Sequence, residues 1–182
     1  MIATERLELI PATPEQVRAA LRGTAPLSAA LGAAVPETWP PEFLDDPAFE
    51  YTLARLLEGP PQTGWWLHFI VLKEGPSGRT LIGSAGYKGP PSDDGTVEVG
   101  YGIVRDRHRR GYASEAVRGL LAHAFAESTV RRVIAETYPE LTGSLGVLRT
   151  CGFSLIGDGS EPGVIRFALT RAEYAAGASA AR

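Results

Sequence analysis

The first regular pattern in the chain is an alternation of apolar and polar residues near its amino terminus. Within residues 4–10, Leu7 and Leu9 share one face and Arg6 and Glu8 share the other. Because successive side chains of a strand point to opposite faces, this alternation predicts a half-buried β-strand.

Three further segments have the character of strands. Residues 64–73 form an apolar and aromatic run, which is typical of a strand buried on both faces. Residues 80–87 and 96–104 predict two more strands, separated by turns that are rich in glycine and proline. Short turns between consecutive strands indicate an antiparallel meander.

Helical spacing accounts for most of the remaining pattern. Thr13 and Gln16 have the spacing of a capping box ahead of a short helix, and a second helix is expected over residues 46–59. Apolar residues at helical spacing predict an amphipathic surface helix over residues 111–125. A strand at 131–138 follows, so this strand, helix and strand predict a βαβ unit with a ligand crevice at the carboxyl ends of the strands.

The carboxyl-terminal part predicts short elements. A helix over residues 144–151 precedes a hairpin built from 154–157 and 164–170, and a last short helix follows. With 182 residues, of which 44% are hydrophobic and 21% charged, the chain has the size and composition of one globular domain spanning residues 1–182. The patterns together predict a mixed α+β fold.

Composition narrows the functional classes. No apolar run approaches the roughly 18 residues of a membrane span, and the amino terminus lacks the basic and then apolar pattern of a signal peptide. A cytoplasmic protein without membrane contact is therefore expected. A single cysteine, Cys151, cannot form an internal disulfide, which agrees with a reducing compartment. The net charge of −3 argues against bulk attraction to nucleic acid or anionic lipid.

The densest positive charge stands at one point of this acidic chain. Residues 105–110 hold four arginines against one aspartate, and Gly111 follows at the expected start of a helix. A helix start leaves about four backbone N–H groups without intrahelical partners and favours anions. The sequence therefore predicts a phosphate site at Gly111.

The strand before this cluster has an unusual polar face. Alternation places Glu98, Gly100 and Gly102 on one face of the strand at 97–104. Glycine inside a strand marks a bulge, or a place where a ligand or another backbone approaches closely. Two interpretations stay open: either a ligand approaches Glu98, or Glu98 faces solvent and the glycines bend the sheet.

Two aromatic positions also allow two interpretations each. His68 lies in the apolar strand and is interpreted as a core histidine in preference to a catalyst. Trp39 stands in a proline-rich loop, where it would either form a pocket wall or plug the edge of the core. Cys151 has no activating partner in its neighbourhood and is not favoured as a nucleophile.

Four pieces of the chain occur in an order that is specific as a set: TERLELIPAT, VEVGYGIV, RRGYASEAV and IAETYPELTGSLGVLRTCGF. They resemble the GNAT superfamily of acyl-CoA-dependent N-acetyltransferases, in particular the branch of the ribosomal-protein N-terminal acetyltransferases. The resemblance covers nearly the whole chain. It implies a mostly antiparallel sheet of about six or seven strands, flanked by helices and splayed around a βαβ cofactor-binding core.

The resemblance also implies a set of site residues, with acetyl-CoA as the acyl donor and no metal. Acetyl-CoA would lie between the strands near residues 97 and 131, with its pyrophosphate on residues 109–114. The implied cofactor-binding residues are Ile103, Val104, His108, Arg109, Arg110, Gly111, Tyr112, Ala113, Ser114 and Leu141. Trp39 and Tyr101 are expected on the acceptor side.

The chain departs from the family pattern at two positions. His108 stands where the family usually has Gln or Arg, which leaves the phosphate site intact because backbone N–H groups do most of the binding. Leu141 stands where an Asn usually hydrogen-bonds the pantetheine arm, three residues before Ser144. The contact is then either lost or made by the backbone.

Amine acetylation needs a base, because an amine near neutral pH is mostly an ammonium ion. Glu98 resembles the family's strand carboxylate and is the expected base. A backbone N–H near residues 101–103 would stabilise the oxyanion. Ser144 resembles the family's proton donor to the thiolate and Tyr138 is the weaker alternative, although Ser144 could instead cap its own helix.

Three functions follow from these features. The first is transfer of an acetyl group from acetyl-CoA to a primary amine by direct attack in a ternary complex, with a small-molecule amine or a protein N-terminus as acceptor. The second is a catalytically weak acyl-CoA sensor, which Leu141 motivates. The third, nucleic-acid binding through the arginines, is disfavoured by the net acidity. A monomer or a homodimer fits each of them.

Overall fold

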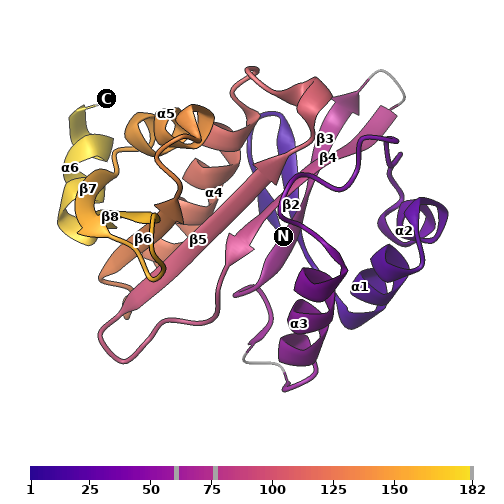
Figure 1. Cartoon of the computed structure of the whole chain (residues 1–182), viewed down its shortest axis with the longest axis horizontal. Helices are drawn as coiled ribbons and strands as arrows, with labels where there is room; N and C mark the ends of the chain where they lie inside the picture. Colours follow the sequence, from indigo (N-terminus) through magenta and orange to yellow (C-terminus); the bar gives the residue numbers. More distant parts are fainter. Residues whose placement is uncertain (60–61, 76–77, 181–182) are drawn as a thin grey trace.

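A computed structural model describes residues 1–59, 62–75 and 78–180. Within these residues the strands form one 8-stranded sheet in the order β1-β2-β3-β4-β5-β6-β8-β7 (Figure 1). The strands are β1 (Ile2–Ala3), β2 (Leu7–Pro11), β3 (Leu67–Gly75), β4 (Gly78–Tyr87), β5 (Thr96–Ile103), β6 (Arg132–Thr137), β7 (Ser154–Asp158) and β8 (Ile165–Thr170). The helices are α1 (Pro14–Leu21), α2 (Thr24–Leu31), α3 (Asp46–Leu56), α4 (Tyr112–Ala126), α5 (Thr142–Thr150) and α6 (Arg171–Ala180).

The predicted mixed fold is confirmed, and the sheet is one strand larger than expected. The added strand β1 has two residues and pairs with β2 at the edge of the sheet, so it is too short to produce an alternating pattern. Helix α2 was not predicted, because its sequence TAPLSAAL is apolar on nearly every side. The strand expected from residue 64 begins at Leu67, since Gly64 adopts a left-handed φ of 85°.

The predicted amino-terminal cap of α1 is confirmed by two reciprocal hydrogen bonds. The Gln16 N–H donates to Thr13 Oγ1 at 3.2 Å, and the Thr13 N–H donates to Gln16 Oε1 at 3.0 Å. A capping box of this kind satisfies two N–H groups that the helix leaves open. The α1 boundary could therefore be located from sequence.

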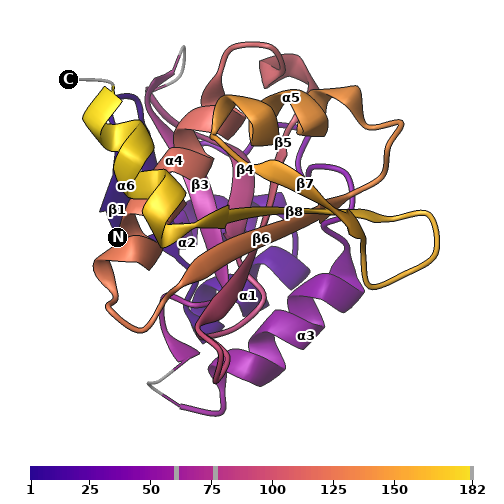
Figure 2. The ribbon, with the colours of Figure 1, turned by 90° about the vertical axis from the view of Figure 1, so that its left-hand side faces the viewer.

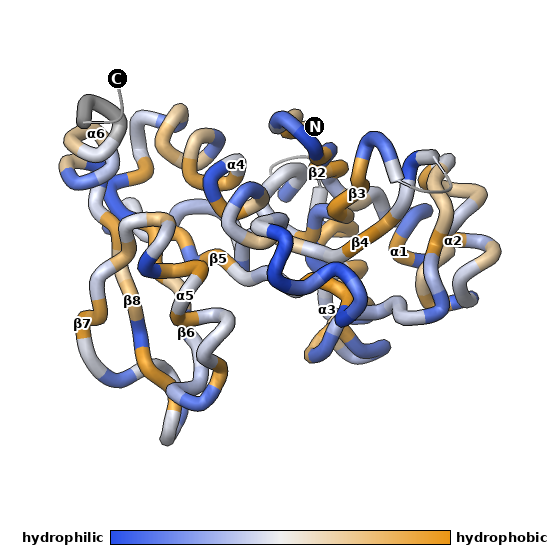
Figure 3. Tube along the Cα trace, turned by 90° about the horizontal axis from the view of Figure 1, so that it is seen from above, coloured by the Kyte–Doolittle hydropathy of each residue, from blue (hydrophilic) through white to orange (hydrophobic). Residues whose placement is uncertain are grey.

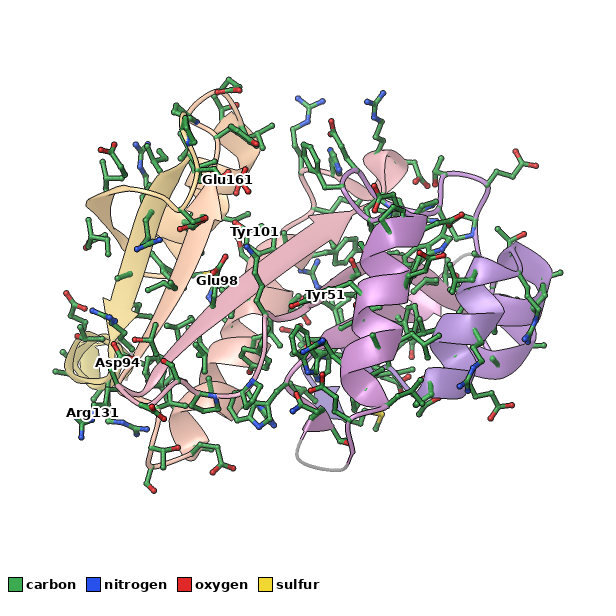
Figure 4. All side chains as sticks on the ribbon, turned by 60° about the horizontal axis from the view of Figure 1, so that its bottom comes forward. Tyr51, Asp94, Glu98, Tyr101, Arg131 and Glu161 are labelled. Carbon is green, nitrogen blue, oxygen red and sulfur yellow. The ribbon has the colours of Figure 1, made fainter. Side chains whose placement is uncertain are left out.

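Helices cover both faces of the sheet. Helix α4 contacts β1, β2, β4 and β5, whereas α1 contacts both α2 and α3. Figure 4 shows α3 in front of the sheet and α4 behind it. A single hydrophobic core joins the elements, with Leu120 of α4, Phe69 of β3 and Val133 of β6 all 0% exposed.

The two halves of the sheet are joined only over a short stretch. Within the described residues, every neighbouring strand pair is antiparallel except β5 and β6, which pair in parallel from Thr96 to Glu98. Strand β5 continues to pair with β4 as far as Ile103, and β6 stays with β8. The halves therefore diverge after Glu98. Figure 3, from above, and Figure 2, from the side of β6–β8, show the two groups of strands running apart.

The expected βαβ unit joins the two halves of the sheet. Strand β5, helix α4 and strand β6 follow each other in the chain, and the parallel register aligns Val97 with Val133. The carboxyl end of β5 and the amino terminus of α4 thus lie at the same edge of the sheet, where parallel sheets bind ligands. Among the described residues, none of the helices is long and apolar enough to cross a bilayer.

His68 lies in the core, as interpreted from the sequence. Its side chain is 1% exposed, its Nδ1–H donates to the Trp66 carbonyl at 3.0 Å, and its ring meets the Tyr87 ring edge-on at 6.2 Å. Burial disfavours the charged form and lowers the pKa of His68 to about 4. The histidine is therefore neutral in the folded protein near pH 7.

His68 should make folding stability depend on pH between its two pKa values. The unfolded chain takes up a proton near the ordinary pKa of 6.5, whereas the folded protein does so only near 4. The contribution is complete above pH 6.5 and is lost as the pH falls toward 4, by roughly 3 kcal/mol in total. Urea unfolding across this range should show a smaller pH dependence for His68→Gln than for the unmodified protein. His108→Gln, at an exposed position, is the matched control, and equal pH dependence in all three proteins would refute the assignment.

Candidate active site

A cleft of about 1060 Å³ lies where the two halves of the sheet separate. It is lined by β4 and β5, by the loop into α4, by the first turns of α5, and by residues 41–44 and 160–161. Most of the residues predicted for the site are among its walls. They are Tyr101, Ile103, His108, Arg109, Gly111, Tyr112, Ala113, Ser114, Leu141 and Ser144.

Trp39 is not part of this cleft, which corrects its expected role as an acceptor contact. Its side chain is 8% exposed and packs against Phe49 and Phe69, with ring centroids 6.5 and 6.0 Å apart. Burial among aromatic rings leaves no face of the indole toward a ligand. The alternative interpretation, a plug at the edge of the core, describes its position.

Two residues of the predicted cofactor set also lie outside the cleft walls. Val104 is 1% exposed and its N–H donates to the Ile82 carbonyl at 2.9 Å, so neither its side chain nor its N–H is open to a ligand. The Arg110 side chain is exposed, and its carbonyl accepts from Arg6 at 3.1 Å. The burial of Val104 corrects its implied contact with the cofactor, whereas a contact of the exposed Arg110 side chain stays a prediction.

The loop into α4 has the geometry of an anion site. Arg109 and Gly111 both adopt left-handed backbone conformations, with φ of 56° and 80°. Gly111 is the N-cap of α4 and no side chain of the described residues caps the helix, so the N–H groups of its first turn remain open. Residues Gly111 to Ser114 line the cleft, and the helix dipole adds positive potential there.

His108 stabilises the turn between the strand and this loop. Its Nε2–H donates to the Ile103 carbonyl at 2.7 Å, which ties the loop to the last residue of β5. The side chain that departs from the family pattern therefore acts within the loop. The backbone N–H groups of α4 stay available for a ligand.

The edge of β5 that faces β6 is open beyond Glu98. A strand in the middle of a sheet forms ladders on both sides, but among the described residues β5 pairs with a neighbouring strand from Val99 to Ile103 only on the β4 side. The backbone groups of alternate residues on the other side face the cleft, where an extended ligand with amide groups can pair with them. The pantetheine arm of coenzyme A is such a ligand.

Glu98 lies at the inner end of the gap. Figure 4 shows its side chain between β5 and β6, with Tyr101 farther along and Glu161 at the outer end. Its carboxylate forms an ion pair with Lys88, which lines the cleft. Oε1 of Glu98 is buried and has no well-oriented hydrogen-bond donor among the described residues. Glu98 itself is not a cleft wall, but its neighbours Val99 and Gly100 are.

A second carboxylate, which the sequence analysis did not single out, faces the cleft from β6. Glu136 accepts hydrogen bonds from the Ser160 N–H at 2.9 Å, the Ser160 hydroxyl at 2.6 Å and Arg166 at 2.7 Å. Burial would raise the pKa of Glu136, but these hydrogen bonds outweigh it and lower the pKa. A carboxylate engaged in this way is a poor proton acceptor and instead anchors the β7–β8 turn.

Tyr101 and Ser144 meet across the gap. The Tyr101 hydroxyl lies 3.1 Å from Ser144 Oγ and donates to the Ser144 carbonyl at 3.2 Å. Burial raises the pKa of Tyr101 to about 12, so it keeps its proton. Helix α5 begins at Thr142 with Leu141 as N-cap, which excludes the alternative role of Ser144 as the cap of its helix.

Leu141 lines the cleft without offering a polar group from its side chain. Its N–H donates to the Tyr138 carbonyl at 3.1 Å, so this N–H is already engaged. Neither group replaces the amide of the Asn that the family usually has at this position.

Cys151 is not suited to be a nucleophile, since burial raises the pKa of its thiol to about 11.

Comparison with known proteins agrees with this geometry. The fold is similar to that of an acetyltransferase that has been solved in complex with coenzyme A. Residues 6–154 match the Acetyltransferase (GNAT) domain family, and the chain belongs to that family. No three His, Cys, Asp or Glu side chains gather into a possible metal site in the part of the chain that the structure describes.

Curated relatives include the uncharacterized N-acetyltransferase p20 of Bacillus licheniformis, 31% identical over 114 residues, and YjdG of Bacillus subtilis, 30% identical over 87 residues. These matches cover 58% and 48% of this chain, and 62% and 51% of the relatives' own length.

Solved structures extend the likeness of the fold over nearly the whole chain. A GNAT-family acetyltransferase from Bacillus anthracis has a TM-score of 0.63 at 19% identity, covering 94% of this chain and 98% of its own. The RimL ribosomal alpha-N-protein acetyltransferase in complex with coenzyme A has a TM-score of 0.64 at 17% identity, covering 92% and 95%.

The open space beside Gly100 provides a steric test of the gap. A Cβ added at Gly100 would meet no atom within 4 Å, so valine fits the folded protein but projects from the cleft wall. Gly100→Val should leave the free energy of unfolding within about 1 kcal/mol and weaken coenzyme A binding at least roughly 10-fold. Calorimetry compares Gly100→Val with Gly177→Ala, a control in α6 with equally open space. Unchanged affinity for Gly100→Val would place the ligand elsewhere.

Proposed function

We propose that this protein transfers the acetyl group of acetyl-CoA to a primary amine by direct attack in a ternary complex. The observation that carries the proposal is one cleft that joins an open helix amino terminus and an unpaired strand edge, with the half-buried Glu98 carboxylate next to the cleft walls Val99 and Gly100. Acetyl-CoA offers a pyrophosphate, two amide groups and a reactive thioester in that same order. The order of these features along the cleft matches the order of the groups along acetyl-CoA, and this match supports the proposal.

In this proposal the amino terminus of α4 binds the pyrophosphate and β5 binds the pantetheine arm. Gly111 lets the phosphate oxygens approach the backbone, because it has no Cβ. The arm would add to β5 as a short strand, so the thioester reaches the narrow end of the gap near Tyr101. Bound acetyl-CoA supplies an activated acyl group, and the protein supplies orientation, proton transfer and electrostatics.

Glu98 would be the base that removes a proton from the acceptor. Its carboxylate is paired with Lys88, whose side chain is 61% exposed and free to move toward solvent. An acceptor ammonium can take the place of the Lys88 ammonium beside the carboxylate. Glu98 then accepts a proton, directly or through water, and leaves a neutral amine to attack the thioester.

Other groups around the gap would stabilise the negative charge on the acetyl oxygen and protonate the departing thiolate. Backbone N–H groups of β5 near Tyr101 can stabilise the negative charge that develops on the acetyl oxygen. Ser144 would donate the proton that the departing thiolate requires. The contact between Tyr101 and Ser144 orients this hydroxyl.

Two classes of acceptor are consistent with the structural neighbours. Structural neighbours include RimL, a ribosomal alpha-N-protein acetyltransferase, and an aminoglycoside acetyltransferase. Either a protein N-terminus or a small amine therefore fits the proposal. A screen of peptides, polyamines, aminoglycosides and amino acids with acetyl-CoA, followed by thiol release, tests it, and no acceptor-dependent release from any class would reject it.

A weak acyl-CoA sensor is the second candidate function. It is favoured by Leu141, since its side chain and its N–H cannot make the contact that Asn makes in the family. A sensor would bind acetyl-CoA in calorimetry and release no thiol with any acceptor. Thiol release with a rate that depends on acceptor concentration would exclude it.

Replacing the proposed base should separate catalysis from binding. Glu98→Gln is expected to lower kcat by about 10²–10⁴-fold while the Kd for coenzyme A stays unchanged, because the amide keeps the shape but accepts no proton. Glu140→Gln, at another carboxylate of the cleft, is the control. Wild-type kcat for Glu98→Gln across the pH range would remove Glu98 from the mechanism.

The two hydroxyls that meet across the gap should behave as one unit. Ser144→Ala and Tyr101→Phe are each expected to lower kcat about 10-fold or more, and the double variant should lose little beyond the larger single effect. Steady-state kinetics at saturating acetyl-CoA measures this. If Tyr138→Phe lowers kcat and Ser144→Ala does not, Tyr138 is the proton donor.

A further inference from the structure

The opening TERL segment of the chain packs against the start of α4 from outside the cleft. Its Arg6 guanidinium contacts three successive positions of the loop into the helix. It donates to the Arg110 carbonyl at 3.1 Å, lies 4.6 Å from the centroid of the Tyr112 ring, and would stand 3.4 Å from a Cβ at Gly111. One side chain thus supports the loop that the proposed function assigns to pyrophosphate.

Glu115 in the first turn of α4 holds this guanidinium in place. Its Oε2 accepts from Arg6 Nε at 2.7 Å, and its Oε1 accepts from the Arg6 N–H at 2.7 Å and the Thr4 hydroxyl at 2.6 Å. Burial would raise the pKa of Glu115, but these hydrogen bonds outweigh it and lower the pKa. Lys73 of β3 adds a further anchor by donating to the carbonyls of Thr4 and Glu5.

The supported segment contains backbone that needs support. Arg109 is a non-glycine residue with a left-handed φ of 56°, and Gly111 follows two positions later with φ of 80°. Left-handed conformations at residues with a Cβ persist when the surrounding structure holds them. The hydrogen bond from Arg6 to the Arg110 carbonyl fixes the peptide between these two positions.

The same contact balances charge. Glu115 places a carboxylate in the first turn of the helix, close to where the pyrophosphate would bind. An unpaired carboxylate there would repel phosphate, and the effect is strong over a few ångströms in partly buried surroundings. Arg6 neutralises it, with Glu115 only 14% exposed and Arg6 42% exposed.

We propose that Arg6 is a positioning residue for the donor. It lines a cavity on the far side of the loop and does not line the cleft, so it acts through the loop and does not touch the ligand. It holds residues 109–111 in the anion-binding conformation and cancels the charge of Glu115. This inference rests on the proposed function, because it assumes that the loop binds the pyrophosphate of acetyl-CoA.

The test compares a donor that contains pyrophosphate with one that lacks it. Arg6→Gln should weaken the calorimetric Kd for coenzyme A about 10- to 100-fold, which corresponds to roughly 1.4–2.8 kcal/mol. With acetyl-pantetheine, which has the thioester arm and no pyrophosphate, kcat/KM should stay within about twofold of wild type. Arg6→Lys keeps the charge without the forked guanidinium, and its Kd for coenzyme A should lie between those of the unmodified protein and Arg6→Gln. Arg18→Gln, at an exposed position on α1, is the matched control.

Each outcome decides a separate claim. Wild-type affinity of Arg6→Gln for coenzyme A, or an equal loss with acetyl-pantetheine, overturns the positioning role. If Arg6→Gln does not fold, Arg6→Lys decides in the same two assays, since it preserves the ion pair with Glu115. If the unmodified protein binds no coenzyme A, the proposed function itself fails, and the inference fails with it.

Discussion

The parallel pairing between β5 and β6 covers Thr96 to Glu98 and then ends, and the rest of the site depends on that limit. A pairing that continued along β5 would close the sheet and satisfy every backbone group on its edge. As built, the pairing fixes the two halves at one end and leaves an open strand edge at the other, directly before the amino terminus of α4.

Packing makes this divergence stable. Helix α4 lies behind the β1–β5 half, and its contact with α5 connects it to the β6–β8 half. Residues Leu120, Phe69 and Val133 are fully buried in one core that spans the divergence. The contact between Tyr101 and Ser144 bridges the gap beyond Glu98. The gap is thus bounded by packed walls, and its polar groups come from the backbone and from a few oriented side chains.

The elements with a strong local signal could be predicted from sequence. Alternation and helical spacing identified β5, α4 and β6 in order, and the Thr13 capping box located α1, because these signals depend on neighbours within a few residues. Helix α2 and strand β1 were missed, since one has no polar face and the other has two residues. Whether Trp39 forms a pocket wall or part of the core could not be decided from sequence, because the answer depends on its contacts with Phe49 and Phe69, which only the fold brings together.

In the candidate site, too, local motifs could be recognised from sequence, whereas contacts between distant residues could not. Gly111 as a helix start and Glu98 on a glycine-lined face were recognisable because each belongs to a short motif. The contacts that orient these groups include two that join residues far apart in the chain: Arg6 with Glu115, and Tyr101 with Ser144.

A crystal structure of the complex with coenzyme A is the most direct test of the central claim, that the gap between β5 and β6 holds the donor with its pyrophosphate at the start of α4. The account predicts phosphate oxygens within hydrogen-bond distance of the backbone N–H groups at residues 111–114, and pantetheine amides paired with the open edge of β5. A complex whose pyrophosphate lies away from Gly111, or whose arm does not enter the gap, would contradict it.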